Sequence, residues 1–180
     1  ISLDKKPLLL QLASKLQKRL IADIDLLTSI QTVLSEEKDD VVTSFDYDAA
    51  SFSLHSRSFL KIQDGCDNSC GYCRVTIARG DSVSLPIGDV LQRCLSLQES
   101  GYKEIVLTGV NISAYKDGDN SLEHLLEKIL EVLSPHMRIR LSSLEPDCFS
   151  EGLLKVLENP QIQPHFHLPL QSLSDRVLDR

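Results

Sequence analysis

Three cysteines within eight residues are the part of this sequence best suited to chemistry. Cys66, Cys70 and Cys73 lie in one tight loop, Asp64–Cys73, whose two glycines and asparagine tolerate the backbone angles needed to wrap a small object. Thiolates are soft ligands that favour zinc or an iron–sulfur cluster. A cubane cluster held by three cysteines keeps one iron without a protein ligand, open to a small molecule. The loop therefore predicts a metal site, with an iron–sulfur cluster as the first interpretation.

Two other interpretations of the loop stay open. A structural zinc site needs four ligands, and the loop supplies three. The other candidate ligands are Cys94, expected in the middle of a helix, Cys148, expected in a distant loop, and His55. The thiols could also be purely structural. Five cysteines, three of them clustered, do not resemble a disulfide framework and indicate a reducing compartment.

Length and composition limit the class of protein. The chain has 180 residues, 42% hydrophobic and 25% charged, which fits about one globular domain with an appendage. Its net charge of −7 repels phosphate, so any nucleic-acid contact must come from a local basic patch. No apolar run approaches the ~20 residues that span a bilayer. We expect a cytoplasmic protein with no membrane or DNA partner.

The alternation of residue patterns predicts the elements that position the cysteine loop. Short strands are expected at Ser58–Gln63, Glu104–Val110, Met137–Leu141 and His165–Leu170, separated by helical patterns. The helical patterns cover Ile87–Gln98, Asn120–Leu133 and Phe149–Leu157. Gly101 should end the first helix, Asn120 with Glu123 should form a capping box for the second, and Asn159-Pro160 should end the third. The order predicts an α/β fold with about four parallel βα units, either an open sheet or part of a barrel.

The first third of the chain has a different character. Apolar residues recur every three or four positions from Pro7 to Leu34, which predicts one long or two abutting helices. Ser35–Ser58 is acidic and serine-rich and is typical of a linker. We therefore expect a helical segment at 1–35, a linker at 36–57 and the α/β core at 58–180. Because the chain starts at Ile1 and ends at Arg180 early in a helical pattern, we expect a piece of a longer protein.

Polar residues follow the later strands, at the edge of a parallel sheet where functional groups gather. Gly109 and Asn111 end the second strand and could meet a ligand or simply form a turn. Ser143 and Glu145 follow the third strand and suit a ribose hydroxyl or an ammonium group, or else cap the next helix. His165 and His167 share one face of the fourth strand and are interpreted as rim histidines. Arg74 and Arg79 flank the cysteine loop and could contact phosphate or balance cluster charge, although solvated surface is the simpler interpretation.

The Cys-x-x-x-Cys-x-x-Cys pattern after the first strand of a parallel α/β array resembles the radical S-adenosylmethionine (radical SAM) superfamily. Several further segments are similar to those of the tRNA methylthiotransferases, and two look most like the subgroup that acts on N6-threonylcarbamoyladenosine. The general segments are Phe59–Cys66, Ala78–Gly80, Gly101–Asn111 and His165–Ser172; the subgroup segments are Arg138–Pro146 and Pro164–His167. The resemblance covers about residues 57–180.

The resemblance implies a partial (β/α) barrel and a [4Fe–4S] cluster on Cys66, Cys70 and Cys73 whose open iron is chelated by S-adenosylmethionine. Reductive cleavage would give a 5′-deoxyadenosyl radical, and the reaction would add a methylthio group to C2 of the adenine in tRNA. An electron donor would be a further partner. The cofactor contacts carried over with the resemblance, together with Ser143 and Glu145 at the same sheet edge, make up the expected cofactor site: Tyr72, Gly109, Asn111, Ser143, Glu145 and Gln171.

Three positions depart from the pattern of that family. Thr76 and Ile77 stand where members usually carry proline and an aromatic residue, and Leu173 stands where they usually carry glycine. Members also carry an N-terminal domain with three more cysteines and a C-terminal RNA-binding domain, neither of which is visible here. Two alternatives therefore accompany the main hypothesis: a radical SAM enzyme with another substrate, and an inactive metal-binding or metal-free fragment that acts as an interaction module.

Overall fold

The computed structural model describes Phe45 and residues 56–179. The predicted N-terminal helical segment and nearly all of the linker lie outside these residues. The described part is centred on a three-stranded parallel sheet with the order β1-β4-β7, formed by β1 (Ser58–Lys61), β4 (Glu104–Thr108) and β7 (Arg138–Leu141). The sheet alternates along the chain with helices, which confirms the predicted α/β class.

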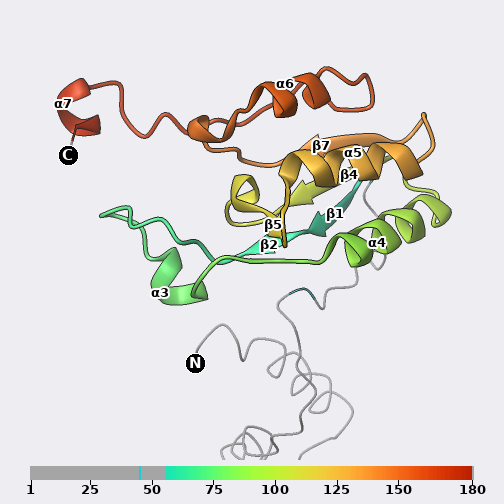
Figure 1. Cartoon of the computed structure of the whole chain (residues 1–180), viewed down its shortest axis with the longest axis horizontal. Helices are drawn as coiled ribbons and strands as arrows, with labels where there is room; N and C mark the ends of the chain where they lie inside the picture. The colour runs from blue at the N-terminus through green and yellow to red at the C-terminus, as the bar shows by residue number, and fades with distance from the viewer. Residues whose placement is uncertain (1–44, 46–55, 180) are drawn as a thin grey trace, which may run out of the picture. The chain divides into compact units, whose positions relative to one another are not determined.

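Three helices follow the strands in chain order. They are α4 (Ile87–Glu99), α5 (Leu122–Val132) and α6 (Glu151–Leu157), and α5 lies between the other two (Figure 1). The predicted helix bounds are correct to within about two residues. Gly101 ends α4 as expected: its φ of 89° is left-handed, its N–H donates to the Gln98 carbonyl, and the next N–H reaches Leu97.

The apolar core lies between one face of the sheet and these helices. The strand register places Leu60, Leu107 and Leu141 side by side, with Ile105 and Ile139 one pleat away on the same face, and all five are buried. The helices contribute Val90, Cys94 and Leu97 from α4 and Leu125, Leu126 and Ile129 from α5. These positions recur every three or four residues, so the predicted helical periodicity corresponds to the buried stripe.

The opposite face of the sheet is more polar. Phe59 is 44% exposed there, and Arg140 of β7 donates to the Glu104 carboxylate of β4 at 2.6 Å. Arg57 also approaches the same carboxylate, at 3.7 Å. None of the helices in the described part is long and apolar enough to cross a membrane.

The first predicted strand is divided in two. Ser58–Lys61 pairs with β4, whereas β2 (Gln63–Asp64) pairs antiparallel with β3 (Val83–Ser84). The change of partner occurs at Ile62, whose N–H donates to the Thr108 carbonyl while its own carbonyl accepts from Leu85. The strand therefore turns away from the main sheet just before the cysteine loop.

The predicted fourth strand, His165–Leu170, is wrong as a regular strand. The chain before and within this segment makes only isolated parallel bridges beside β7, Ile139 with Ile162 and Ser143 with His167. Pro164 and Pro169 lack the N–H that a continuous ladder requires, which explains why the pairing is interrupted. The structure therefore contains three parallel strands followed by an irregular fourth segment and α7 (Asp175–Leu178).

The predicted capping box of the second helix is displaced by one residue. The N-cap of α5 is Ser121, and the residue at N3 is His124, whose Nδ1 accepts from the Ser121 N–H at 3.3 Å. Asn120 instead pairs with Asp117 in the small hairpin of β5 (Lys116–Asp117) and β6 (Asn120–Ser121). The hairpin was not predicted, nor was the short helix α3 (Val75–Arg79) after the cysteine loop. The short 3₁₀ helices η3 (Ile112–Ala114) and η4 (Pro146–Cys148) follow β4 and β7.

Candidate functional site

The cysteine loop leaves β2 through a turn that requires glycine. Gly65 has a φ of +70°, and a Cβ at this position would lie 1.9 Å from the Asp81 carbonyl oxygen. The next N–H, of Cys66, donates to the Gly80 carbonyl at 3.2 Å. The start of the loop is thus held against the segment that follows α3, and no larger residue fits at this point.

The three thiols belong to this loop and are accessible. Cys66 is half-buried, while Cys70 and Cys73 are exposed. The Asn68 N–H lies 3.4 Å from the Cys66 sulfur and the Val75 N–H lies 3.5 Å from the Cys73 sulfur. Backbone N–H groups directed at cysteine sulfur are among the interactions that tune iron–sulfur clusters. The three cysteine sulfurs are therefore ligands of the type that an iron–sulfur cluster uses.

The sulfurs are not drawn together into a coordination shell. Within Phe45 and residues 56–179, no group of three or more His, Cys, Asp or Glu side chains is arranged to hold a metal ion. Thr76 of α3 restrains the loop, because its hydroxyl lies 3.2 Å from the carbonyl oxygens of both Cys66 and Asn68. The other two cysteines do not belong to the loop. Cys94 is buried in α4, where burial raises the pKa of its thiol to about 12, and Cys148 lies in η4.

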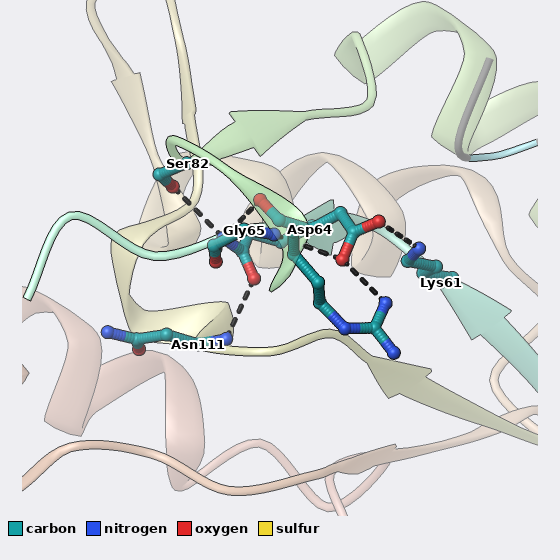
Figure 2. A network of polar contacts seen from close by, with 7 residues as sticks. Lys61, Asp64, Gly65, Ser82 and Asn111 are labelled. Carbon is teal, nitrogen blue, oxygen red and sulfur yellow. Dashed lines mark hydrogen bonds and ion pairs between the residues drawn. The ribbon is translucent and has the colours of Figure 1, made fainter. Parts of the chain in front are cut away.

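A buried carboxylate anchors both ends of the loop. Asp64 accepts from Lys61 Nζ at 2.5 Å and from Arg79 Nη1 at 2.9 Å, and the Gly65 N–H donates to it at 3.0 Å (Figure 2). Burial raises the pKa of Asp64, but the hydrogen bonds from Lys61 and Gly65 and the Lys61 charge outweigh it, so the net pKa is lowered. The carboxylate is therefore charged at neutral pH and ties α3 to the strand that precedes the loop.

The segment after β4 comes close to this anchor. The Asn111 N–H donates to the Gln63 side-chain oxygen at 2.7 Å, and the Asn111 side chain accepts from the Ser113 N–H at 3.2 Å. Asn111 is buried, with 8% of its surface exposed. Gly109 is packed against Gln63, since a Cβ there would lie 2.8 Å from the Gln63 carbonyl oxygen. These contacts hold Asn111 at the carboxyl edge of the sheet and do not decide between the ligand and turn interpretations of this segment.

The segment after β7 joins the same edge. Ser113, which follows Asn111, accepts from the Glu145 N–H through its hydroxyl at 2.9 Å. The Glu145 side chain makes no cap to η4, so the predicted capping role is not found for it. Ser143 lies 2.7 Å from His167 Nδ1, oxygen to nitrogen. This contact and the bond from the Leu144 N–H to the His167 carbonyl hold the irregular fourth segment against β7.

Tyr72 links the cysteine loop to the end of the fourth segment. Its hydroxyl donates to the side-chain oxygen of Gln171. The pKa of Tyr72 is raised, first by desolvation and then by its electrostatic interactions with Cys70, Cys73 and Glu145. Gln171 is the only described residue other than glycine with a positive φ, 59°. Residues other than glycine seldom adopt this backbone conformation, and such backbone strain is concentrated at functional sites.

The structure thus brings most of the predicted site residues to one edge of the sheet. Tyr72 contacts Gln171, Asn111 is joined through Ser113 to Glu145, and Ser143 contacts His167. His165 is exposed, as expected for a rim position. Arg79 is committed to Asp64, so it is not a free surface cation, whereas Arg74 is exposed beside the loop.

Three residues of this region were missed by sequence reasoning. Gln63, Asp64 and Thr76 carry the contacts that fix the cysteine loop. Gln63 and Asp64 form a polar pair at the end of an apolar strand, which is only a weak signal of this role in the sequence. Nothing in the sequence indicated that Thr76 would reach back to the loop.

Comparison with known proteins identifies the family. The model of the radical SAM superfamily matches residues 60–180. The chain is 41% identical over 149 residues to the threonylcarbamoyladenosine tRNA methylthiotransferase MtaB of Treponema pallidum, covering 83% of this chain and 31% of that protein. It is 37% identical over 167 residues to MtaB of Thermotoga maritima, covering 91% and 38%.

A relative named for a different substrate is also similar. The tRNA-2-methylthio-N(6)-dimethylallyladenosine synthase of Endomicrobium trichonymphae is 33% identical over 138 residues, covering 74% of this chain and 33% of that protein. The chain spans about a third of the length of these curated relatives. Superfamily membership implies a [4Fe–4S] cluster and S-adenosylmethionine. On the match over 60–180 and the thiol loop after the first parallel strand, this chain belongs to the radical SAM superfamily.

Proposed function

We propose that the chain is the radical SAM core of a tRNA methylthiotransferase that adds a methylthio group to C2 of N6-threonylcarbamoyladenosine. The observation that carries this proposal is the 41% identity to an MtaB protein over 149 residues, 83% of this chain. Because the chain spans about a third of its relatives, the activity of the whole enzyme is part of the proposal.

Cys66, Cys70 and Cys73 would hold the cluster. Cys70 and Cys73 are exposed and Cys66 is half-buried on a single loop, which would give the cluster access to a small molecule, and the backbone N–H groups near two of the sulfurs would tune the cluster. When bound, the cluster supplies the electron that cleaves S-adenosylmethionine reductively. An external electron donor is the partner that this chemistry requires.

The residues at the sheet edge would bind S-adenosylmethionine. Tyr72 lies on the cysteine loop and suits the adenine ring, while Gly109 and Asn111 suit the methionine amino end. Ser143, Glu145 and Gln171 offer a hydroxyl, a carboxylate and an amide on the neighbouring segments. This donor and acceptor set matches a ligand with an ammonium group, a ribose and a purine.

The tRNA partner must be recognised against an unfavourable overall charge of −7. Arg74 is exposed next to the cluster loop and is the residue we assign to a phosphate contact there. A cation in this position would lie close to the reacting base.

The first test is metal content after anaerobic reconstitution, with an electron paramagnetic resonance spectrum recorded with and without S-adenosylmethionine. We expect about four irons per chain and a spectrum that changes when the cofactor is added, as an open-iron cubane requires. Zinc alone, or no metal and no spectral response, would support the alternative of a structural module and overturn the assignment of an enzyme core.

The second test concerns the substrate. Because this piece alone need not be active, the whole enzyme that contains this core would be incubated with a reductant, sulfide, S-adenosylmethionine and tRNA. The tRNA would carry either threonylcarbamoyladenosine or dimethylallyladenosine, and the nucleosides would be measured by mass spectrometry. We expect methylthio product only from the first tRNA. Product only from the second would transfer the assignment to the other substrate class. Cleavage of S-adenosylmethionine by the whole enzyme with neither product would contradict the proposed methylthiotransferase activity.

A further inference from the structure

Gln63 is a fully buried polar side chain to which the family match assigns no role. It has no exposed surface and lies in β2, immediately before Asp64 and the cysteine loop. Its amide nitrogen lies 2.9 Å from the Asp64 carbonyl oxygen, 2.8 Å from the Gly65 carbonyl oxygen and 2.9 Å from the Ser82 hydroxyl. All three partners belong to the segments that begin and end the cysteine loop.

The other end of the same amide holds the segment after β4. The Gln63 Oε1 accepts from the Asn111 N–H at 2.7 Å. The orientation of the amide is fixed by its surroundings, because a flip would turn the NH₂ group toward an N–H donor and the oxygen toward two carbonyls. Figure 2 labels its partners Ser82 and Asn111, which come from different segments.

Gly109 also lies close against the Gln63 side chain, with no space for a larger residue. A Cβ on Gly109 would lie 3.0 Å from both the Cβ and the Oε1 of Gln63. The segment Gly109–Asn111 therefore packs directly against this side chain, and a displacement of the amide would displace the Asn111 backbone. One residue touches both the base of the cysteine loop and the segment that follows the neighbouring strand.

We propose that Gln63 is a positioning residue that fixes the cysteine loop relative to Gly109–Asn111, and that the affinity for S-adenosylmethionine depends on this link. The inference rests on the proposed function, which assigns the cluster to the loop and the methionine end of the cofactor to Gly109–Asn111. A ligand that bridges the two segments binds well only if their separation is set within a fraction of an ångström.

Two substitutions separate the donor and acceptor roles of the amide. Gln63→Leu removes both, whereas Gln63→Glu keeps an acceptor for the Asn111 N–H but replaces the donors to the Asp64 and Gly65 carbonyls with oxygen. Ser82→Ala is the matched control, because it removes one bond of the same amide and leaves both carbonyls and Asn111 in contact.

The first measurement uses the metal-free 180-residue chain and does not depend on activity. Hydrogen exchange of the Asn111 amide should be faster by about tenfold in Gln63→Leu and close to wild type in Gln63→Glu and Ser82→Ala. The amide of Ile129 in α5 should be unchanged in all three. Equal acceleration at Ile129 and Asn111 would indicate general destabilisation and overturn the specific role.

The second measurement uses the reconstituted chain. We expect Gln63→Leu and Gln63→Glu to retain iron near the wild-type content but to bind S-adenosylmethionine about tenfold more weakly in the spectral titration, with Ser82→Ala near wild type. Binding within about twofold of wild type in both Gln63 variants would overturn the proposal.

If the Gln63 variants do not fold, Gly109→Ala tests the same contact from the other side and should weaken cofactor binding with iron retained. Unchanged binding would refute the link. A wild-type chain that binds neither cluster nor cofactor would refute the proposed function instead, while the exchange experiment would still decide whether Gln63 fixes Asn111.

Discussion

Replacing Asp64 by asparagine should destabilise the chain measurably, because the carboxylate joins three segments from a buried position. Its oxygens accept from Lys61, Arg79 and the Gly65 N–H, and 9% of its side chain is exposed. Asparagine has the same shape but presents an NH₂ group to one of the two cations. The variant therefore loses at least one charge-assisted hydrogen bond and leaves a cation facing a donor.

The magnitude follows from the exposure of the partners. A hydrogen bond to a charged group contributes about 1.5–3 kcal/mol. Water can reach Lys61, which is 24% exposed, and Arg79, which is 37% exposed, so the loss should be in the lower part of that range, about 2 kcal/mol. For a chain of this size about 2 kcal/mol corresponds to a fall in Tm of about 4–8 °C.

The assay is thermal unfolding of the metal-free chain, followed by circular dichroism at pH 7 and at lower pH. Because the folded pKa of Asp64 is lowered from 3.8, its contribution is fully present above pH 3.8 and is lost as the pH falls through the folded pKa. The difference between wild type and variant should therefore shrink on acidification below pH 3.8. Asp81→Asn, at an exposed carboxylate nearby, is the control and should leave Tm unchanged. A Tm within 1 °C of wild type at pH 7, or a difference that does not shrink in acid, would refute the reasoning.

Three further substitutions or measurements test the core and the cysteines. Ile129→Ala removes a fully buried side chain between α5 and the sheet and should cost about 2–5 kcal/mol by denaturant titration, with the slope unchanged. Ser150→Ala removes the N-cap that accepts from the Leu153 N–H at 2.9 Å and should cost about 1 kcal/mol by the same titration; no change would mean that α6 does not depend on this cap. Because burial raises the pKa of Cys94 to about 12, its thiol should react with a disulfide reagent at pH 8 far more slowly than the exposed Cys70; equal rates in the native chain would contradict its burial.

The fold was predictable where local periodicity coincides with burial. The stripes of α4 and α5 and the three short strands are visible in the sequence because each presents one apolar face to the same core. The prediction of a fourth strand was wrong because the segment lacks continuous pairing. Its alternating residues predict a strand, but Pro164 and Pro169 interrupt the ladder. The pattern alone does not indicate whether a neighbouring strand can form continuous hydrogen bonds with it.

The site was predictable in its residues but not in its connections. The cysteine spacing and the polar residues after each strand identified the edge of the sheet, since parallel strands place their carboxyl ends together. The contacts that set the geometry come from Gln63 and Asp64, which are far in sequence from Asn111 and Arg79. Such pairings depend on how β2 leaves the main sheet at Ile62, and that change of partner has no local signature in the chain.

The departures from the family pattern near the cysteines illustrate how a loop can keep its anchor with different residues. Thr76 stands at a position where proline is usual, and its hydroxyl reaches the carbonyl oxygens of Cys66 and Asn68, which proline could not do. It lies in the first turn of α3, where the backbone N–H needs no helical partner, so either residue is compatible with the helix. Leu173, by contrast, is 90% exposed and restrains nothing in the described part of the chain. A hydroxyl contact from Thr76 therefore helps to fix the loop that carries the thiols, at a position where the resemblance leads us to expect proline.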